Sequence, residues 1–342
     1  MKIVTLRRVL VTSLFLTLLL ASVILLSITV GSVKVPPLRS ITILFQSILG
    51  SEKGNETERA IVLFLRFPRA ILAGFVGAGL SVAGVIFQAL LRNPLADPYI
   101  LGVSSGSAVG AIVAILMGLG SLSSGLPLAS FVGALLTVII VFYFGRQNGK
   151  IHPNTLLLAG VITSSFLSAV IMFFISVSQR EELHTIIFWL MGDFGFSSFG
   201  AIRMIAPYIL VGFFFLYIQA RRLNLILAGE ESALQMGVDI ERLRLICYVT
   251  ASLMTAASVS ICGLIGFVGL IVPHSVRLVL GPDHRLLIPA SALVGASFLI
   301  VADSLARALL APIELPVGVI TAAFGGPFFI YLLKTRKVVK AL

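Results

Sequence analysis

Few side chains in this sequence have a type and spacing that could do chemistry. No nucleophile is matched with a base, so the chain has no evident catalytic chemistry of its own. The segment 145–150 ends in Gly-Lys but has three intervening residues rather than four, and Ile151 replaces the hydroxyl residue of a phosphate-binding loop. His152, His184 and His284 are isolated and lack metal-ligand spacing. We expect no enzyme activity, no metal site and no cofactor.

Three ionisable residues lie at the ends of apolar segments, where they could serve an ion-driven transporter: Asp97, His274 and Asp303. His274 follows Pro273 directly, with Arg277 one turn further on. It could belong to a proton relay, or it could be satisfied by neighbouring backbone or by a carboxylate. Inverted repeats and broken helices at the bilayer midplane would favour ion coupling, and the sequence shows neither convincingly.

A pair of arginines opens the second long apolar segment. In Arg66-Phe-Pro-Arg69 the proline suits a first helical turn, and the two arginines are one turn apart. They could bind carboxylates of an extracellular partner, or simply extend toward lipid headgroups. Arg307 lies four residues after Asp303. It could pair with Asp303 within one helix, or join Arg66 and Arg69 in an outer basic set with Asp303 as counter-charge.

Two polar segments on the side opposite these arginines have compositions typical of functional loops. In the segment 92–98, two prolines forbid a continuous helix, and Asn93 and Leu95 are placed to plug a pore. The segment 229–237 reads as a short helix with acids in its first turn and glycine at its C-terminal cap. Such a helix suits docking into a cytoplasmic partner, and an ordinary loop helix is the alternative.

The elements that position these residues are membrane spans. The chain has 342 residues, of which 58% are apolar and only 11% charged, so a soluble fold is excluded. An all-α fold is expected, because exposed strands cannot satisfy their backbone in lipid. We predict about ten spans, each of roughly 20 residues. They cover 9–30, 68–91, 100–118, 127–145, 156–176, 203–219, 245–262, 265–280, 286–306 and 316–333.

Charge sets the orientation of these spans. The net charge of +11 needs no nucleic-acid partner, because most basic residues fall in alternate loops and at both ends. The positive-inside rule therefore predicts a multi-pass protein of the cytoplasmic membrane with both termini inside. We expect one permease domain over 1–342, with 31–67 as a solvated outer loop, a short interfacial helix within 177–202, and 220–244 on the cytoplasmic side.

Several motifs together resemble one family. They are RFPR, Gln88, RNPLADPYILGVSSG from residue 92, LLLAG at 156–160, GEESALQMGV from residue 229, GLIGFVGLIVPHSVR from residue 263, GPDHR at 281–285 and ELPVG from residue 314. In order and spacing they resemble the iron-siderophore, cobalamin and haem permeases of ABC importers, the type II importers. The match runs from about residue 59 to residue 333.

The resemblance implies partners and roles. It implies a homodimer in the lipid bilayer, two cytoplasmic ATPase subunits and an extracellular or periplasmic substrate-binding protein. Arg66, Arg69 and Arg307 look like the residues that meet the binding protein, and Asn93, Leu95, Asn154 and Thr155 look like the cytoplasmic gate. The segment 223–237 looks like the coupling helices, with Leu223, Asn224, Gly229, Glu230, Glu231, Ala233, Met236 and Gly237 as coupling residues.

The mechanism that the resemblance implies is alternating access driven by the separate ATPase. We expect an axial pore whose wall includes Ser164, Phe166, Ser168, Met172 and Phe173. The cargo would be a ferric siderophore, cobalamin or haem, with molybdate or tungstate as alternatives within the same family. An ion-gradient-driven secondary transporter and a receptor that transports nothing are the alternatives from other classes.

Overall fold

The computed structural model describes residues 4–31, 33, 35–50, 55–119, 124–147 and 150–334. The basic tail after residue 334, which contributed to the predicted orientation, lies outside the described residues. Within the described part the fold is helical apart from one minimal hairpin, in which β1 (Arg146–Gln147) pairs antiparallel with β2 (Lys150–Ile151). The predicted all-α fold is confirmed.

Ten apolar helices in the described residues correspond to the ten predicted spans. They are α1 (Leu6–Thr29), α4 (Phe67–Leu90), α5 (Val103–Leu116), α6 (Gly125–Gly145), α7 (Pro153–Val177), α9 (Phe199–Ile218), α12 (Ile240–Cys262), α13 (Val268–Leu280), α14 (His284–Ala308) and α15 (Val317–Lys334). Seven are long and apolar enough to cross a membrane, and the helices at 103–116, 268–280 and 317–331 are shorter. An intact helix satisfies its own backbone, which a segment in lipid requires.

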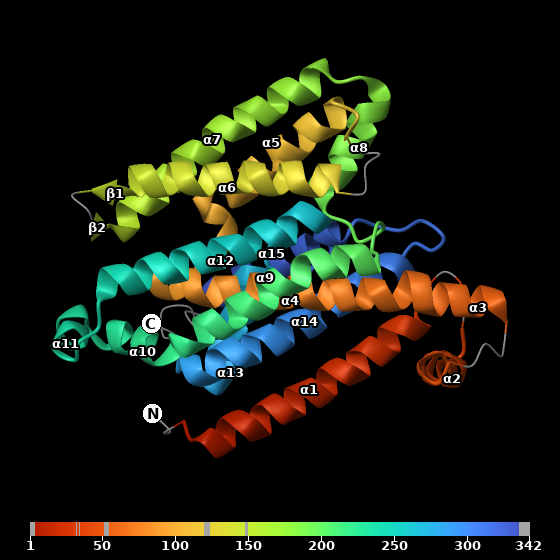
Figure 1. Ribbon diagram of the computed structural model, residues 1–342, viewed down its shortest axis with the longest axis horizontal. Helices are drawn as coiled ribbons and strands as arrows, with labels where there is room; N and C mark the ends of the chain where they lie inside the picture. Colours follow the sequence, from red (N-terminus) through yellow and green to blue (C-terminus); the bar gives the residue numbers. More distant parts are fainter. Residues whose placement is uncertain are drawn as a thin grey trace.

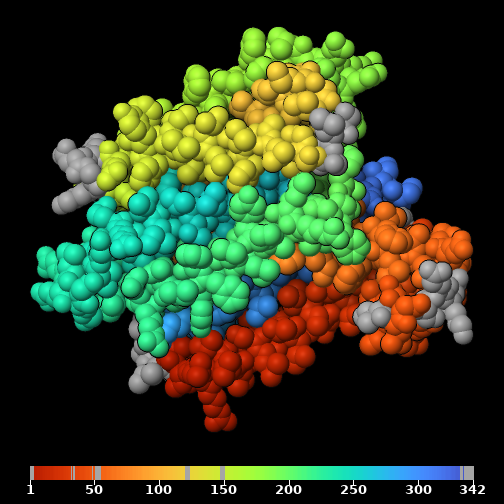
Figure 2. All heavy atoms as spheres, viewed as in Figure 1, coloured from red at the N-terminus to blue at the C-terminus, as the bar shows by residue number. Residues whose placement is uncertain are grey.

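The helices form a bundle around α4. Helix α4 packs against α12, α13 and α14, and its side chains are buried along almost the whole length. Helix α1 lies along one edge of the bundle and the group α5, α6 and α7 along the opposite edge (Figure 1). Helix α6 rests against α12 at the boundary of that group (Figure 2). The residues of the second span therefore form the core, and those of α1 and α7 form the periphery.

Helices α4 and α13 approach so closely that their backbones touch. A Cβ at Gly84 would lie 2.9 Å from the Cα atom of Gly269 and would collide with its carbonyl oxygen. A Cβ at Gly269 would lie 2.6 Å from the Cδ atom of Pro98, in the short helix η2 (Pro98–Leu101). Small residues permit such contact between membrane helices, where apolar burial gives little drive for association.

The segment 31–67, predicted to be a solvated outer loop, is largely helical in its described residues. It contains α2 (Pro37–Ile48), α3 (Glu56–Ala60) and the π-helix η1 (Ile61–Arg66), which runs directly into α4. Ile43 of α2 is buried in a small cluster with Val62 and Ile28. Helix α2 is seen end-on beside the end of α1, so it runs across the direction of the spans (Figure 1).

Three further short helices lie in the polar gaps. Helix α8 (Arg180–Met191) is the short helix predicted within 177–202. Helices α10 (Ala220–Ala228) and α11 (Glu230–Gln235) occupy the predicted coupling segment. They project at the end of the bundle opposite α2 and α3 (Figure 1).

Candidate functional site: an arginine cluster and the predicted coupling segment

The first site residues gather at the end of the bundle that carries α2. The Nε atom of Arg69 donates to Asp303 at 2.9 Å, and its Nη1 atom donates to Glu314 at 2.7 Å. The Nε atom of Arg307 donates to the second oxygen of Asp303 at 3.0 Å. The ion pair between Asp303 and Arg307, one of the two alternatives for Arg307, is present, and the same carboxylate also binds Arg69 of α4.

Two arginines of this cluster also complete the end of α1. The last carbonyl groups of a helix have no partner within it and carry the negative end of its dipole. Arg66 donates to the carbonyl of Ile28 at 2.9 Å, and Arg307 donates to that of Val30 at 3.0 Å and to the hydroxyl of Ser27 at 3.0 Å. The two guanidinium groups therefore cap α1.

The position of these arginines differs from the surface position that the sequence predicted. The structure does bring Arg66, Arg69 and Arg307 to one end of the molecule, but they are only 5%, 7% and 4% exposed. Most of their donors already have partners, in α1, in α14 and at Glu314, whereas the Nη2 atom of Arg69 has no hydrogen-bond partner among the described residues and lies 3.7 Å from Asp193. Their role in docking stays a prediction, and Glu314 is the more exposed group of the cluster. Sequence reasoning gave Glu314 no role, because nothing in its spacing indicates Arg69 as its partner.

The predicted short helix forms at the opposite end. Glu230 and Glu231 lie in the first turn of α11, and Gly237, with φ +80°, follows its last turn. The backbone N–H of Gly237 donates to Leu234 and that of Val238 to Ala233, which is the Schellman pattern of helix termination. Gly229, with φ +143°, separates α10 from α11. Gly237 therefore ends the helix, as predicted, and Gly229 bounds it at the other end.

The coupling residues divide between two faces of α10 and α11. Leu223 and Ala233 are buried, so they anchor the segment and cannot contact a partner. Glu231, Met236 and Gly237 are exposed. Leu234, which sequence reasoning did not select, is 59% exposed, and Met236 is 65% exposed. The exposed face of α11 thus presents large apolar side chains beside a carboxylate.

Asn224 attaches α10 to the start of α14. Its side-chain amide donates to Asp283 at 2.8 Å, and its oxygen accepts from the backbone N–H of His284 at 2.9 Å. Burial opposes ionisation of Asp283, but hydrogen bonds from Arg285 and Asn224 and the Arg285 charge outweigh it and lower the pKa of Asp283 to about 2. The carboxylate is therefore charged at neutral pH, and α10 is held to α14 by a charge-assisted hydrogen bond.

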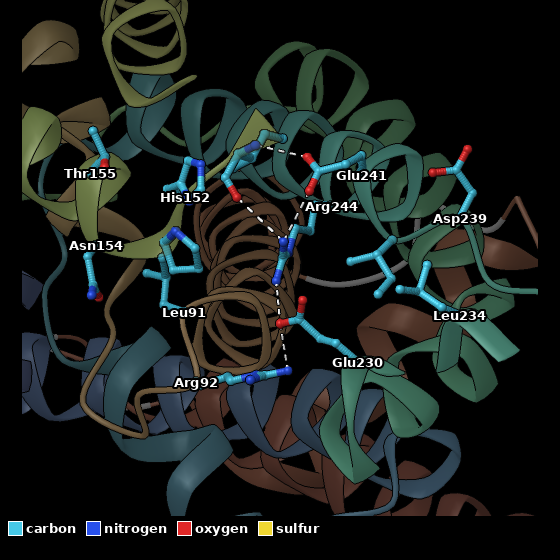
Figure 3. A pocket seen from close by; sticks show the side chains of 13 residues that line it. Leu91, Arg92, His152, Asn154, Thr155, Glu230, Leu234, Asp239, Glu241 and Arg244 are labelled. Carbon is cyan, nitrogen blue, oxygen red and sulfur yellow. Dashed lines mark hydrogen bonds and ion pairs between the residues drawn. The ribbon is translucent and has the colours of Figure 1, made fainter. Parts of the chain in front are cut away.

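Glu230 attaches α11 to two other elements. Its Oε1 atom lies 2.7 Å from the Nη2 atom of Arg92, after α4, and 2.7 Å from that of Arg244 in α12. Arg244 also contacts Glu241 at 3.2 Å, and Glu241 accepts from the backbone N–H of Ile151 at 2.8 Å. Figure 3 shows this network crossing the groove from Arg92 to the strand that precedes α7.

The network borders a groove of about 1020 Å³. Leu91, Arg92, 151–155, Glu230, Leu234, 239–241 and Arg244 line it. The predicted gate residues Asn154 and Thr155 lie on the side opposite Glu230 and Leu234 (Figure 3). Asn93 and Leu95 do not line the groove. The side chain of Asn93 accepts from the backbone N–H of Leu95 at 2.9 Å and so shapes the turn after α4.

Comparison with known proteins identifies this arrangement. Residues 18–335 match the model of the FecCD transport family. The chain belongs to the FecCD transport family. It is 46% identical over 283 residues to a cobalamin import system permease protein of Halobacterium salinarum, covering 83% of this chain and 76% of the relative. It is 38% identical over 289 residues to a hemin transport system permease protein of Yersinia pestis, covering 83% and 86%.

A solved structure supports the same assignment. It shows an inward-facing conformation of a metal-chelate type ABC transporter, with a TM-score of 0.81 and 33% identity over 94% of this chain and 98% of the other. An Fe(3+)-citrate import system permease protein of Bacillus subtilis is 34% identical and covers 96% of both chains. The chain is thus a membrane-spanning permease subunit of this type of ABC importer.

In this FecCD permease, α7 carries the residues predicted to line the pore. Phe166, Met172 and Phe173 are more than half exposed, and Ser168 is exposed too. Ser164 differs, because it is half-buried and its Oγ atom would lie 3.2 Å from a Cβ built on Gly102. Helix α7 therefore offers an unpartnered apolar face, and Ser164 belongs to its packed side. The role of these residues in the pore stays a prediction.

Asp97 and His274, two of the candidate ion-binding residues, differ in their hydrogen bonding. Asp97 accepts from the backbone N–H of Tyr99 at 2.8 Å and so caps η2. Burial raises the pKa of Asp97 to about 6, against the opposing effect of that hydrogen bond. His274 is fully buried, and among the described residues neither ring nitrogen has a hydrogen-bond partner. The alternative in which backbone or a carboxylate satisfies His274 is therefore not found in this part of the chain.

Proposed function

We propose that this permease imports a metal chelate, a ferric siderophore, cobalamin or haem, by alternating access. The relatives named above, for cobalamin, hemin and Fe(3+)-citrate, support this class of cargo. Molybdate or tungstate is the alternative within the family. Residues 1–342 act as one permease domain of the cytoplasmic membrane, with both termini inside. ATP hydrolysis takes place in a separate subunit.

The observation that carries the proposal is the arrangement of α10 and α11. The segment is fixed to the bundle through Asn224 and Glu230, while Leu234 and Met236 face outward. A helix that is rigidly attached on one face and apolar on the other can receive force from a partner and pass it on. We propose that two cytoplasmic ATPase subunits grip this face.

The remaining partners follow from two other surfaces. The apolar face of α7 supports a homodimer in which two such faces line an axial pore, and the short helix α8 follows at its outer end. The outer end that holds the arginine cluster is the proposed docking place of a substrate-binding protein. There Glu314 and Asp193 share Arg69 with Asp303, so a partner's charges could compete for these ion pairs.

Reconstituted transport tests the function directly. In proteoliposomes that contain the permease and its cognate ATPase, with binding protein and cargo outside, we expect vanadate-sensitive uptake that survives collapse of proton and sodium gradients. Uptake that needs a gradient but no ATP would instead establish a secondary transporter. Binding of cargo without uptake under any condition would indicate a receptor.

The exposed face of α11 gives a second prediction. Leu234→Asp combined with Met236→Asp should weaken binding of the ATPase on the order of 30-fold or more, because apolar anchors at an interface centre typically contribute 2 kcal/mol or more. Co-purification of the ATPase and titration of its binding would measure the loss. Phe196→Asp, at a phenylalanine on the outer side that is 96% exposed, is the control. Equal binding by both variants would remove α11 from the interface.

A further inference from the structure

One carboxylate oxygen of Glu230 joins three separate parts of the chain. Its Oε1 atom is 2.7 Å from Arg92 and 2.7 Å from Arg244, so α11, the end of α4 and α12 meet at a single atom. With Glu241 the cluster contains two cations and two anions. No other ion pair in the described residues lies between α11 and the rest of the bundle.

Each arm of this network ends beside a predicted gate segment. Arg92 is the residue directly before Asn93 and has a left-handed backbone, with φ +48°, at the point where α4 turns into the loop 92–98. The other arm passes through Arg244 and Glu241 to the backbone N–H of Ile151. Ile151 is three residues before Asn154, so both gate segments are connected to the same carboxylate.

The groove makes these connections necessary. Leu234 and Glu230 line one side of it, and Asn154 and Thr155 line the other (Figure 3). A groove of about 1020 Å³ separates this part of α11 from α7, so a displacement of α11 reaches α7 through the residues and elements that border the groove. The charged side chains that line the groove provide a direct link between its two sides. Coupling of this kind needs a contiguous set of contacts that both ends can bias.

The contribution of the network to static stability is small. The side chains of Arg92 and Glu230 are 47% and 36% exposed, and ion pairs that water reaches are typically worth about 1 kcal/mol or less. Their geometry matters more than their energy, because a carboxylate shared by two guanidinium groups fixes the distances among three elements. Arg244, with only 11% of its side chain exposed, provides the firm point of the set.

We propose that Glu230 is a positioning residue that transmits movement of α11 to both cytoplasmic gate segments. The proposal rests on the proposed ATP-driven import. A displacement of α11 by the ATPase moves the carboxylate of Glu230. Through one arm of the network, the carboxylate moves Arg92 and with it the turn at Asn93. Through the other arm, it moves Arg244 and with it Glu241 and Ile151.

The first test is the number of ATP molecules hydrolysed per cargo molecule imported. Glu230→Gln keeps the shape of the side chain and removes its charge, so we expect this ratio to rise on the order of tenfold, within the usual range of coupling free energies. Arg92→Gln should raise it too, and the double variant should be no worse than the more severe single variant, because the two residues share the contact that carries the coupling, although Arg92 also donates to the carbonyl of Ile226 at 3.3 Å. The melting temperature should change little in all three. Glu58→Gln, which removes a carboxylate from the outer ion pair with Arg39, is the control.

The second test follows the gate itself. Cys247 and Cys262 are buried, so Asn154→Cys introduces a thiol that differs from both in exposure. With Glu230 intact, we expect ATP and vanadate to change the rate at which a maleimide labels residue 154. In the Asn154→Cys variant that also carries Glu230→Gln, the rate should be independent of nucleotide even though the ATPase still binds.

The outcomes separate this proposal from the proposed function. Two results would show that Glu230 is not a positioning residue. One is the same number of ATP molecules hydrolysed per cargo molecule in the protein with Glu230 and in Glu230→Gln. The other is an equal response of labelling at residue 154 to nucleotide in both proteins. If Glu230→Gln lowers the melting temperature substantially and lowers uptake as well, the role of Glu230 is structural. If the unmodified permease shows no ATP-dependent uptake, the proposed function itself fails.

Discussion

Replacing Asp303 with asparagine is expected to destabilise the protein by about 3–5 kcal/mol, the usual cost of removing one partner from a buried ion pair. The side chain of Asp303 is completely buried and accepts from both Arg69 and Arg307. Without its charge Arg69 still has Glu314, but Arg307 has only carbonyl and hydroxyl partners in α1 and α14. Thermal unfolding in detergent, followed by loss of monodispersity, measures the effect.

Two companion variants show whether charge is the cause. Glu58→Gln breaks the outer pair with Arg39, whose side chain is 51% exposed, and should cost less than about 1 kcal/mol. Arg307→Gln added to Asp303→Asn should restore part of the stability, because it removes the uncompensated guanidinium group. An equal cost for Asp303→Asn and Glu58→Gln would mean that water reaches the cluster and that the ion pairs contribute little.

The spans could be predicted because composition alone decides which segments enter lipid. Each predicted span corresponds to an apolar helix, and the starts and ends differ by a few residues. One departure has a clear physical cause: α13 was expected to start at residue 265 and begins at Val268. Gly263 and Phe267 both have positive φ, so the backbone turns there. Apolar composition carries no signal for such a turn.

The outer segment was predicted incorrectly for a different reason. The polar residues at 51–56 favour a solvated loop, but they carry no information about the rest of 31–67. Residues 37–48 have a proline at the first helical position and apolar residues on one side of a helix, which together could have indicated α2. The local pattern of this stretch is sufficient to predict a helix.

The sequence predicts which segments and residue types belong to the candidate site, but it does not predict which residues contact each other there. Motif order placed Arg69, Asp303 and Glu230 in functional segments, yet the partners of Arg69 are 234 and 245 residues away in the sequence. Only the packing of α4 against α14 brings them together. The same holds for Glu230, whose link to Arg92 depends on how α11 folds back beside the end of α4. Residue type indicates that a charge needs a partner, and the fold decides which partner it finds.

Gly84→Ala is expected to have a similarly large effect on stability, by a purely steric route. The added methyl group would collide with the carbonyl oxygen of Gly269, and backbone cannot rotate away as a side chain can. Overpacking a core usually costs about 1–3 kcal/mol, and we expect the upper end or more because α13 itself must shift. The shift would also pull Ile265, whose backbone N–H donates to the hydroxyl of Tyr99 at 3.1 Å, away from η2.

Helix α4 contains its own control for this variant. A Cβ at Gly74 would lie 3.5 Å from the Cδ1 atom of Ile300, an ordinary contact. Gly74→Ala should therefore be neutral or stabilising by up to about 1 kcal/mol through helix propensity. Melting temperatures of the two variants measured side by side decide the matter. Equal values would show that α4 and α13 separate at little cost, and the close backbone contact would then not be what holds η2 and the turn at 92–98 in place.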